Sequence, residues 1–124
     1  MLLHEDLSYQ IVGSAIEVHR ELGPGLLESA YEACLCHEFT LRGIQYHRQA
    51  ERPVIYKGLV IDCGYRIDIL VEGLIVLELK AVSEFLPIYE AQLMTYLKLT
   101  ECRLGLLMNF NVSVMKDGIK RIVL

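Results

Sequence analysis

The stretch that decides the fold runs from residue 65 to residue 80 and reads YRIDILVEGLIVLELK. Two runs of aliphatic and β-branched residues flank the pair Glu72-Gly73, a combination that is typical of two antiparallel strands joined by a tight turn. The sequence therefore predicts a hairpin whose strands are residues 65–71 and 74–82.

Three charged residues interrupt this apolar hairpin, namely Asp68 in the first strand and Glu78 and Lys80 in the second. Side chains alternate between the two faces of a strand, so Glu78 and Lys80 share one face. Opposed residues of a hairpin also share a face, so the turn decides where Asp68 lies. A two-residue turn would place Asp68 opposite Leu77. A three-residue turn around Gly73, or a β-bulge, would place Asp68 opposite Glu78.

Two carboxylates on one face repel each other unless a cation lies between them, and hard oxygen ligands of this kind suit Mg²⁺ or Mn²⁺. Lys80, on the same face, could orient a water molecule or offset charge that develops on a phosphate. The competing interpretation is structural. Glu78 and Lys80 would then form a solvated strand face, and Asp68 would be a buried carboxylate paired with Arg66 or Lys80.

The rest of the chain predicts further helices and strands from its apolar periodicity. The predicted helices are residues 7–22, 27–42 and 83–98, the last with Pro87 near its start. The predicted strands are residues 53–56, 59–63 and 103–110, followed by a C-terminal hairpin of residues 112–115 and 119–124. This order is typical of a mixed α/β domain.

Length and composition narrow the class of protein. The chain has 124 residues, of which 53% are hydrophobic, and a net charge of −4. Such a chain can bury a core, and we expect residues 1–124 to form one domain. No apolar run approaches the ~18 residues of a membrane span, and no secretory signal pattern opens the chain, so we expect a soluble, cytoplasmic protein. Because the chain is acidic, a nucleic-acid role would require a local basic patch or bound cations.

Basic and metal-ligating residues outside the hairpin give weaker signals. Arg48, Arg52, Lys57 and Arg66 cluster in the sequence and could contact phosphates or form a solvated face. The four cysteines contain no CxxC pair, and the four histidines form neither an HxxxH nor an HExxH pattern, so a zinc site is not predicted.

Three motifs together resemble a known family. Asp68 followed by Glu78-Leu79-Lys80 resembles the D…(E/D)xK signature of the PD-(D/E)XK nuclease superfamily, although Ile67 stands where many members have proline. Residues 25–31, GLLESAY, resemble the defining motif of the GxxExxY proteins, a bacterial and archaeal family placed in that superfamily. Residues 109–110 and 116–123 are also similar to that family, so the resemblance covers the chain from about residue 7 to its end.

The resemblance implies a fold and a site. The fold would be a restriction-endonuclease-like core, with a mixed central sheet flanked by helices in the order αβββαβ, an extra N-terminal helix and a C-terminal hairpin. Mg²⁺ or Mn²⁺ would be bound by Asp68, Glu78, the backbone carbonyl of Leu79 and Glu28. Lys80 would act on the attacking water, with Glu28 as a metal or water ligand. Gln92 and Tyr96, which share a helical face, resemble the QxxxY motif that helps to position substrate.

The function that the resemblance implies is hydrolysis of phosphodiester bonds in nucleic acid by a metal-activated water. The nucleic acid would be DNA rather than RNA. The alternative is a catalytically inactive domain of the same fold that binds nucleic acid or protein. We also expect a homo-oligomer, because a small apolar chain often associates and the edge of the C-terminal hairpin could pair between subunits.

Overall fold

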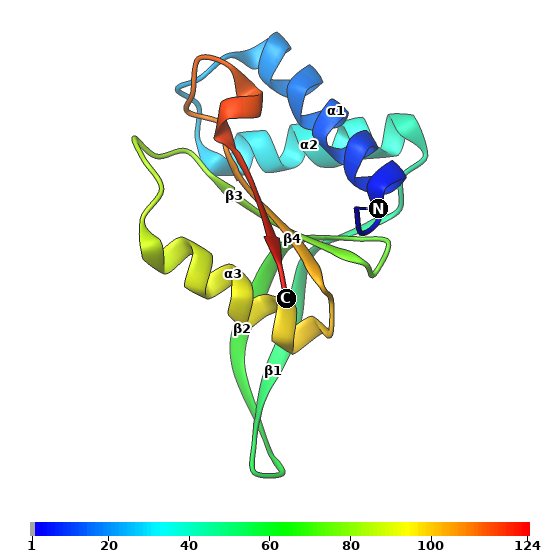
Figure 1. Ribbon diagram of the computed structural model, residues 1–124, viewed down its shortest axis with the longest axis vertical. Coiled ribbons are helices and arrows are strands. Elements are labelled where there is room, and N and C mark those ends of the chain that lie inside the picture. Colours follow the sequence, from blue (N-terminus) through cyan, green and yellow to red (C-terminus); the bar gives the residue numbers. More distant parts are fainter. Residues whose placement is uncertain (1) are drawn as a thin grey trace.

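A five-stranded mixed sheet forms the centre of the computed structural model, which describes residues 2–124 except the side chain of Cys63 (Figure 1). The strands lie in sequence order across the sheet: β1 (Tyr46–Tyr56), β2 (Leu59–Val71), β3 (Ile75–Lys80), β4 (Leu104–Asn109) and β5 (Ile119–Val123). Only β3 and β4 are parallel, and α3 makes the crossover between them. The predicted mixed α/β order is therefore confirmed.

Three α-helices cover the sheet: α1 (Glu5–Leu22), α2 (Glu28–Arg42) and α3 (Pro87–Thr100). Local sequence sets their ends. Helix α2 stops at Gly43, whose left-handed φ of 72° is a common helix C-terminus. Helix α3 begins at Pro87 and not at residue 83 as predicted, because proline suits the first position of a helix and opposes a position inside it. Within residues 2–124, no helix is long and apolar enough to cross a membrane.

Each face of the sheet has its own apolar core. Helices α1 and α2 pack Ile11, Tyr31 and Phe39 against one face, which includes Leu77 of β3. Helix α3 packs against the other face, and its Leu93 is fully buried. The fit at that face is tight, because a Cβ added at Gly105 of β4 would lie 2.8 Å from the Leu93 side chain.

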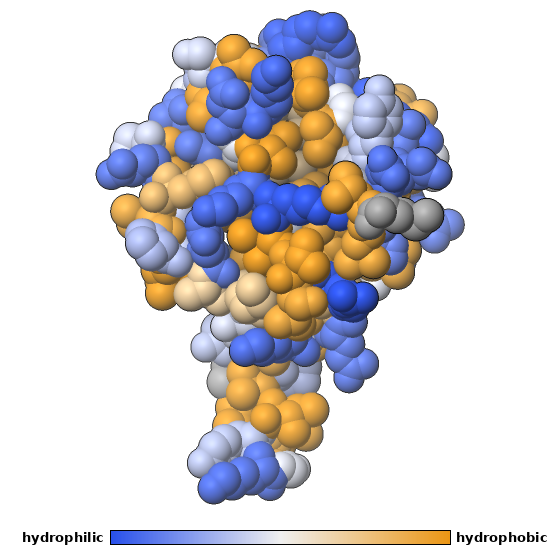
Figure 2. Space-filling view, in the orientation of Figure 1, coloured by the Kyte–Doolittle hydropathy of each residue, from blue (hydrophilic) through white to orange (hydrophobic). Residues whose placement is uncertain are grey.

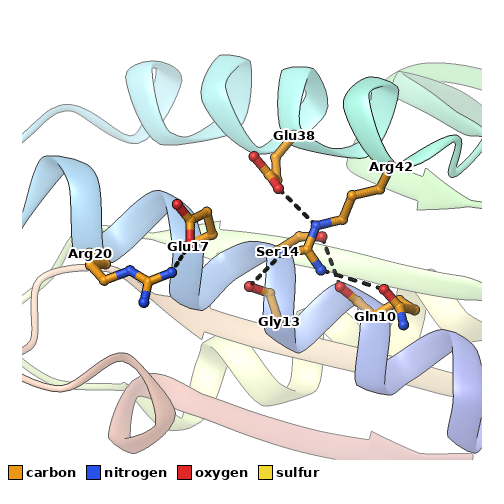
Figure 3. Close-up of polar contacts among 7 residues, drawn as sticks. All are labelled: Gln10, Gly13, Ser14, Glu17, Arg20, Glu38 and Arg42. Carbon is orange, nitrogen blue, oxygen red and sulfur yellow. Dashed lines mark hydrogen bonds and ion pairs between the residues drawn. The ribbon is translucent and has the colours of Figure 1, made fainter.

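A polar clamp joins α1 to α2 at the outer surface (Figure 3). Arg42 of α2 donates to Glu38 at 2.8 Å on its own helix and reaches Gln10 Oε1 and the Gly13 carbonyl of α1, each at 3.4 Å. Helix α2 is thereby held to α1 by polar contacts at the surface, in addition to its apolar packing against the sheet.

Strands β1 and β2 continue beyond β3 as a two-stranded arm, which projects from the body of the molecule (Figures 1 and 2). Ile55, Leu59 and Val60 near its tip are 61–66% exposed. The predicted strands 53–56, 59–63 and 65–71 are thus parts of two longer strands. Cross-strand pairing extends them through the polar residues 46–52 and past Gly64, whose φ is 70°.

The predicted C-terminal hairpin of residues 112–115 and 119–124 is wrong in its first half. Strand β5 pairs instead with β4, and a 3-10 helix, η1 (Met115–Gly118), precedes it. Tertiary contacts explain the difference, because Met115 is buried in the core of α1 and α2 and His19 Nε2 lies 2.8 Å from the Val112 carbonyl oxygen.

Candidate functional site

The turn between β2 and β3 has the odd length that the site requires. Ile69 pairs with Leu77 and Val71 with Ile75, so three residues form the turn. Glu72 and Gly73 of this turn adopt positive φ angles of 52° and 67°. This register confirms the predicted three-residue turn and places Asp68 and Glu78 across from each other.

Where β2 and β3 separate, the side-chain carboxylates of Asp68 and Glu78 accept the hydrogen bonds that backbone carbonyls accept in a regular ladder. The last regular pair is Ile69 with Leu77. Beyond it, the Asp68 N–H donates to Glu78 Oε2 at 2.9 Å, and the Leu79 N–H donates to Asp68 Oδ2 at 2.8 Å. Both carboxylates therefore lie in the gap between two strands of one sheet.

Burial raises the pKa of both carboxylates above their ordinary values. Glu78 is only 5% exposed. Burial, followed by the negative charge of Asp68, raises the pKa of Glu78 from its ordinary 4.5 to about 8. Burial is also the main cause that raises the pKa of Asp68 from 3.8 to about 6, against the lowering effect of the Leu79 N–H. Lys80 lowers both pKa values, and its charge is too little to reverse the shifts.

Helix α2 brings two more carboxylates toward this pair. Glu28 is the exposed first residue of α2, and its charge contributes to the raised pKa of Asp68. Glu32 lies one helical turn later and is buried, and its charge raises the pKa of both Asp68 and Glu78. Glu32 was not among the residues predicted from the sequence, although its i, i+4 spacing from Glu28 places both on one helix face.

A hydrogen-bonded loop holds Glu28 at the start of α2. The Tyr31 hydroxyl donates to the Gly23 carbonyl at 2.6 Å and accepts from the Leu26 N–H at 3.1 Å. Its ring stacks on Phe110 with centroids 4.6 Å apart. Within the GLLESAY motif, Tyr31 therefore helps to position Glu28, because it holds the loop that leads into Glu28.

Lys80 lies at the end of β3 on the same face of the strand as Glu78. Its ammonium group lies 4.6 Å from the centroid of the Tyr89 ring, a cation–π geometry that restrains the flexible side chain. The lysine is half-buried, so its charge acts on the carboxylates with limited screening by water.

Helix α3 carries Gln92 and Tyr96 side by side, and the charges of the carboxylates act on Tyr96. Gln92 Nε2 donates to the Tyr96 hydroxyl at 3.2 Å, as their i, i+4 spacing permits. Burial, then the charges of Glu78 and Asp68, raises the pKa of Tyr96. The Tyr96 ring also meets Tyr65 of the arm edge-on at 6.4 Å. The hydroxyl therefore belongs to the electrostatic environment of the carboxylates.

These groups fit a divalent cation in their chemistry. Within the part of the chain that the structure describes, no three His, Cys, Asp or Glu side chains form a ready metal cluster. Among the described residues, each carboxylate nevertheless has one oxygen that accepts no backbone N–H, and a bound cation would favour the ionised forms that burial and nearby negative charge disfavour. The Leu79 N–H points toward β2, and the N–H and C=O of a strand residue point the same way, so the Leu79 carbonyl also faces the gap.

Comparison with known proteins places the chain in a family. No curated protein and no solved structure matches the chain. A family model described as the PD-(D/E)XK nuclease superfamily matches residues 5–122. The central sheet flanked by helices, in the order αβββαβ after α1, is consistent with the restriction-endonuclease-like fold of that superfamily. From this match over nearly its whole length, the chain belongs to the PD-(D/E)XK nuclease superfamily.

Proposed function

We propose that the protein is a nuclease that hydrolyses phosphodiester bonds of nucleic acid with the help of Mg²⁺ or Mn²⁺. The observation that carries the proposal is the break in the β2–β3 ladder, where Asp68 and Glu78 face each other in a largely buried gap. A fold alone does not determine a function, but a buried and a half-buried carboxylate opposed beside a lysine are a chemical feature of the site itself.

Each residue has a proposed role. Asp68, Glu78 and the Leu79 carbonyl would bind the metal, with Glu28 as a further ligand to the metal or to its water. When bound, the cation would polarise the phosphate and lower the pKa of a water molecule. Lys80 would hydrogen-bond the attacking water or the phosphate. Gln92 and Tyr96 would position the substrate from α3.

Cleavage assays on matched variants test this proposal. We expect the wild-type chain to cleave labelled DNA in Mn²⁺ and to lose cleavage in EDTA. Asp68→Asn and Glu78→Gln should lower the rate by at least about 100-fold, because each change removes a charged ligand. Asp62→Asn is the control, since exposed Asp62 lies on β2 but in the arm. Full activity in both site variants would reject the proposal.

One observation favours a second candidate, a catalytically inactive domain that binds nucleic acid or protein. Asp68 and Glu78 already accept backbone N–H groups, an arrangement that could hold two strands together without any metal. A wild-type chain that binds DNA without cleaving it in either Mg²⁺ or Mn²⁺ would support this candidate.

Two finer points complete the proposal. The loop before Glu28 supports placing the chain among the GxxExxY proteins. Gly25 adopts a positive φ in this loop, and the Tyr31 hydroxyl hydrogen-bonds its backbone, so Gly25 and Tyr31 together fix the start of the helix that carries Glu28. We further propose that DNA is favoured over RNA and that the chain forms a homo-oligomer through the edge strand β5.

A further inference from the structure

A strained residue in β1, Gln49, lets two neighbouring side chains bind the same buried carboxylate, that of Glu32. Gln49 has a left-handed φ of 54° inside the strand. Regular alternation would send Arg48 and Gln49 to opposite faces. Instead, Arg48 Nε donates to Glu32 Oε2 at 2.6 Å and Gln49 Nε2 donates to Glu32 Oε1 at 2.8 Å. Such a backbone conformation costs about 1–3 kcal/mol, and conformations of this kind cluster at functional sites.

This cluster of Glu32, Arg48 and Gln49 lies beside the proposed metal ligands. Arg48 pairs across the sheet with Ile69, the residue after Asp68. Glu32 is close enough for its charge to raise the pKa of Asp68. The strained segment therefore brings a guanidinium to the border of the carboxylate site.

Arg48 differs from the other cations near the first strands. Arg66 pairs with Glu51 at 3.2 Å, and Arg52 donates to the Glu51 carbonyl, both on the projecting arm. Lys80 rests over an aromatic ring. Arg48 uses only its Nε for Glu32, and across the described residues its two Nη groups contact no protein acceptor. Its side chain is 42% exposed, so these donors face solvent.

We propose that Arg48 binds a backbone phosphate of the nucleic acid adjacent to the phosphate that is hydrolysed, and that Glu32 and Gln49 position it. This inference rests on the proposed nuclease function. A guanidinium held through one nitrogen keeps a rigid fork of donors for phosphate oxygens and loses little further freedom on binding. An acidic chain also needs a fixed cation wherever it receives a polyanion.

The test isolates Arg48 without leaving an unpaired buried charge. Glu32→Gln keeps the side-chain size and one acceptor oxygen for Arg48 Nε, while its amide nitrogen faces Gln49, whose side-chain amide can turn to accept from it. Glu32→Gln with Arg48→Met then removes the guanidinium alone. Binding of labelled DNA is measured in Ca²⁺, without cleavage, from about 50 to about 200 mM salt. We expect Glu32→Gln to bind as tightly as wild type, because the amide oxygen still positions Arg48 Nε and one negative charge near the DNA is removed. We expect the double variant to bind about tenfold more weakly, with a log–log salt slope smaller by about 1. Arg20→Met is the control, because Arg20 is exposed on α1 and pairs with Glu17.

Two results would overturn this inference: no DNA binding by the wild-type chain, or equal affinity and salt slope in the single and double variants. Mn²⁺ titration of the same proteins separates it from the proposed function. A double variant that binds Mn²⁺ normally but DNA weakly supports the phosphate site. A smaller salt slope in a chain that neither binds Mn²⁺ nor cleaves DNA would support the phosphate site while rejecting the nuclease.

Discussion

Replacing Glu78 with glutamine should stabilise the metal-free protein at alkaline pH and slightly destabilise it at acid pH. A raised pKa means that the folded state holds a proton which the unfolded chain has already released. The contribution of protonated Glu78 to the stability of the wild-type protein is therefore fully present below pH 4.5 and is lost as the pH rises toward about 8. Glutamine cannot ionise, so the variant escapes this loss, and its amide oxygen can still accept the Asp68 N–H.

The structure sets the size of this effect. A pKa raised from 4.5 to about 8 corresponds to about 5 kcal/mol of unfavourable free energy for the ionised carboxylate at pH 8. Burying the neutral amide of glutamine costs part of that gain. Because this amide cost is the same at every pH, we expect Glu78→Gln to raise the free energy of unfolding by about 2–3 kcal/mol at pH 8 and to lower it by about 1 kcal/mol at pH 5.

Urea unfolding in EDTA at several pH values between 5 and 8 measures this difference. Glu72→Gln, in the exposed turn between β2 and β3, is the matched control and should show no comparable pH dependence. In Mn²⁺ at a hundred times its Kd, the wild-type protein should gain about 2.7 kcal/mol and the Glu78→Gln variant should gain nothing. A variant that is less stable than wild type at pH 8 in EDTA would contradict a large energetic cost for the ionised, buried Glu78.

Three further outcomes follow from the same geometry. Tyr31→Phe leaves the Gly23 carbonyl and the Leu26 N–H without their partner, so chemical denaturation should show a loss of about 1–3 kcal/mol, and Mn²⁺ titration should show weaker binding if Glu28 is a ligand. Gly118→Ala would place a Cβ 2.1 Å from the Asn109 carbonyl oxygen, so its melting temperature should fall by an amount equivalent to about 3 kcal/mol or more; an unchanged value would contradict the packing. Metal binding at pH 7 should release protons because the pKa of Glu78 is about 8, and calorimetry in buffers of different ionisation enthalpy would reveal the release; heats independent of buffer would count against metal binding at Glu78.

Much of the site was predictable because it depends on short-range rules. Alternation along a strand placed Glu78 and Lys80 on one face, and the demand that Asp68 join them predicted the odd turn that the structure contains. Helical spacing linked Gln92 to Tyr96 in the same way. These relations involve residues close in sequence or joined by one turn.

The parts that sequence analysis missed depend on distant partners. Glu32 sits in an amphipathic helix, and only contacts from Arg48 and Gln49 explain why a charged residue is buried there. The polar half of β1 lacks the alternation of a strand and is extended because β2 supplies its backbone partners. The residues around Val112 had strand propensity, but packing against α1 prevented a local hairpin.

Calorimetric titration of Mn²⁺ into the wild-type chain, Asp68→Asn and Asp62→Asn tests the central claim most directly. We expect binding to the wild type and to Asp62→Asn, and loss of binding in Asp68→Asn, because Asp68, unlike Asp62, faces Glu78 in the gap between β2 and β3. Equal binding by all three proteins, or binding by none of them with and without DNA present, would contradict a metal site at these carboxylates.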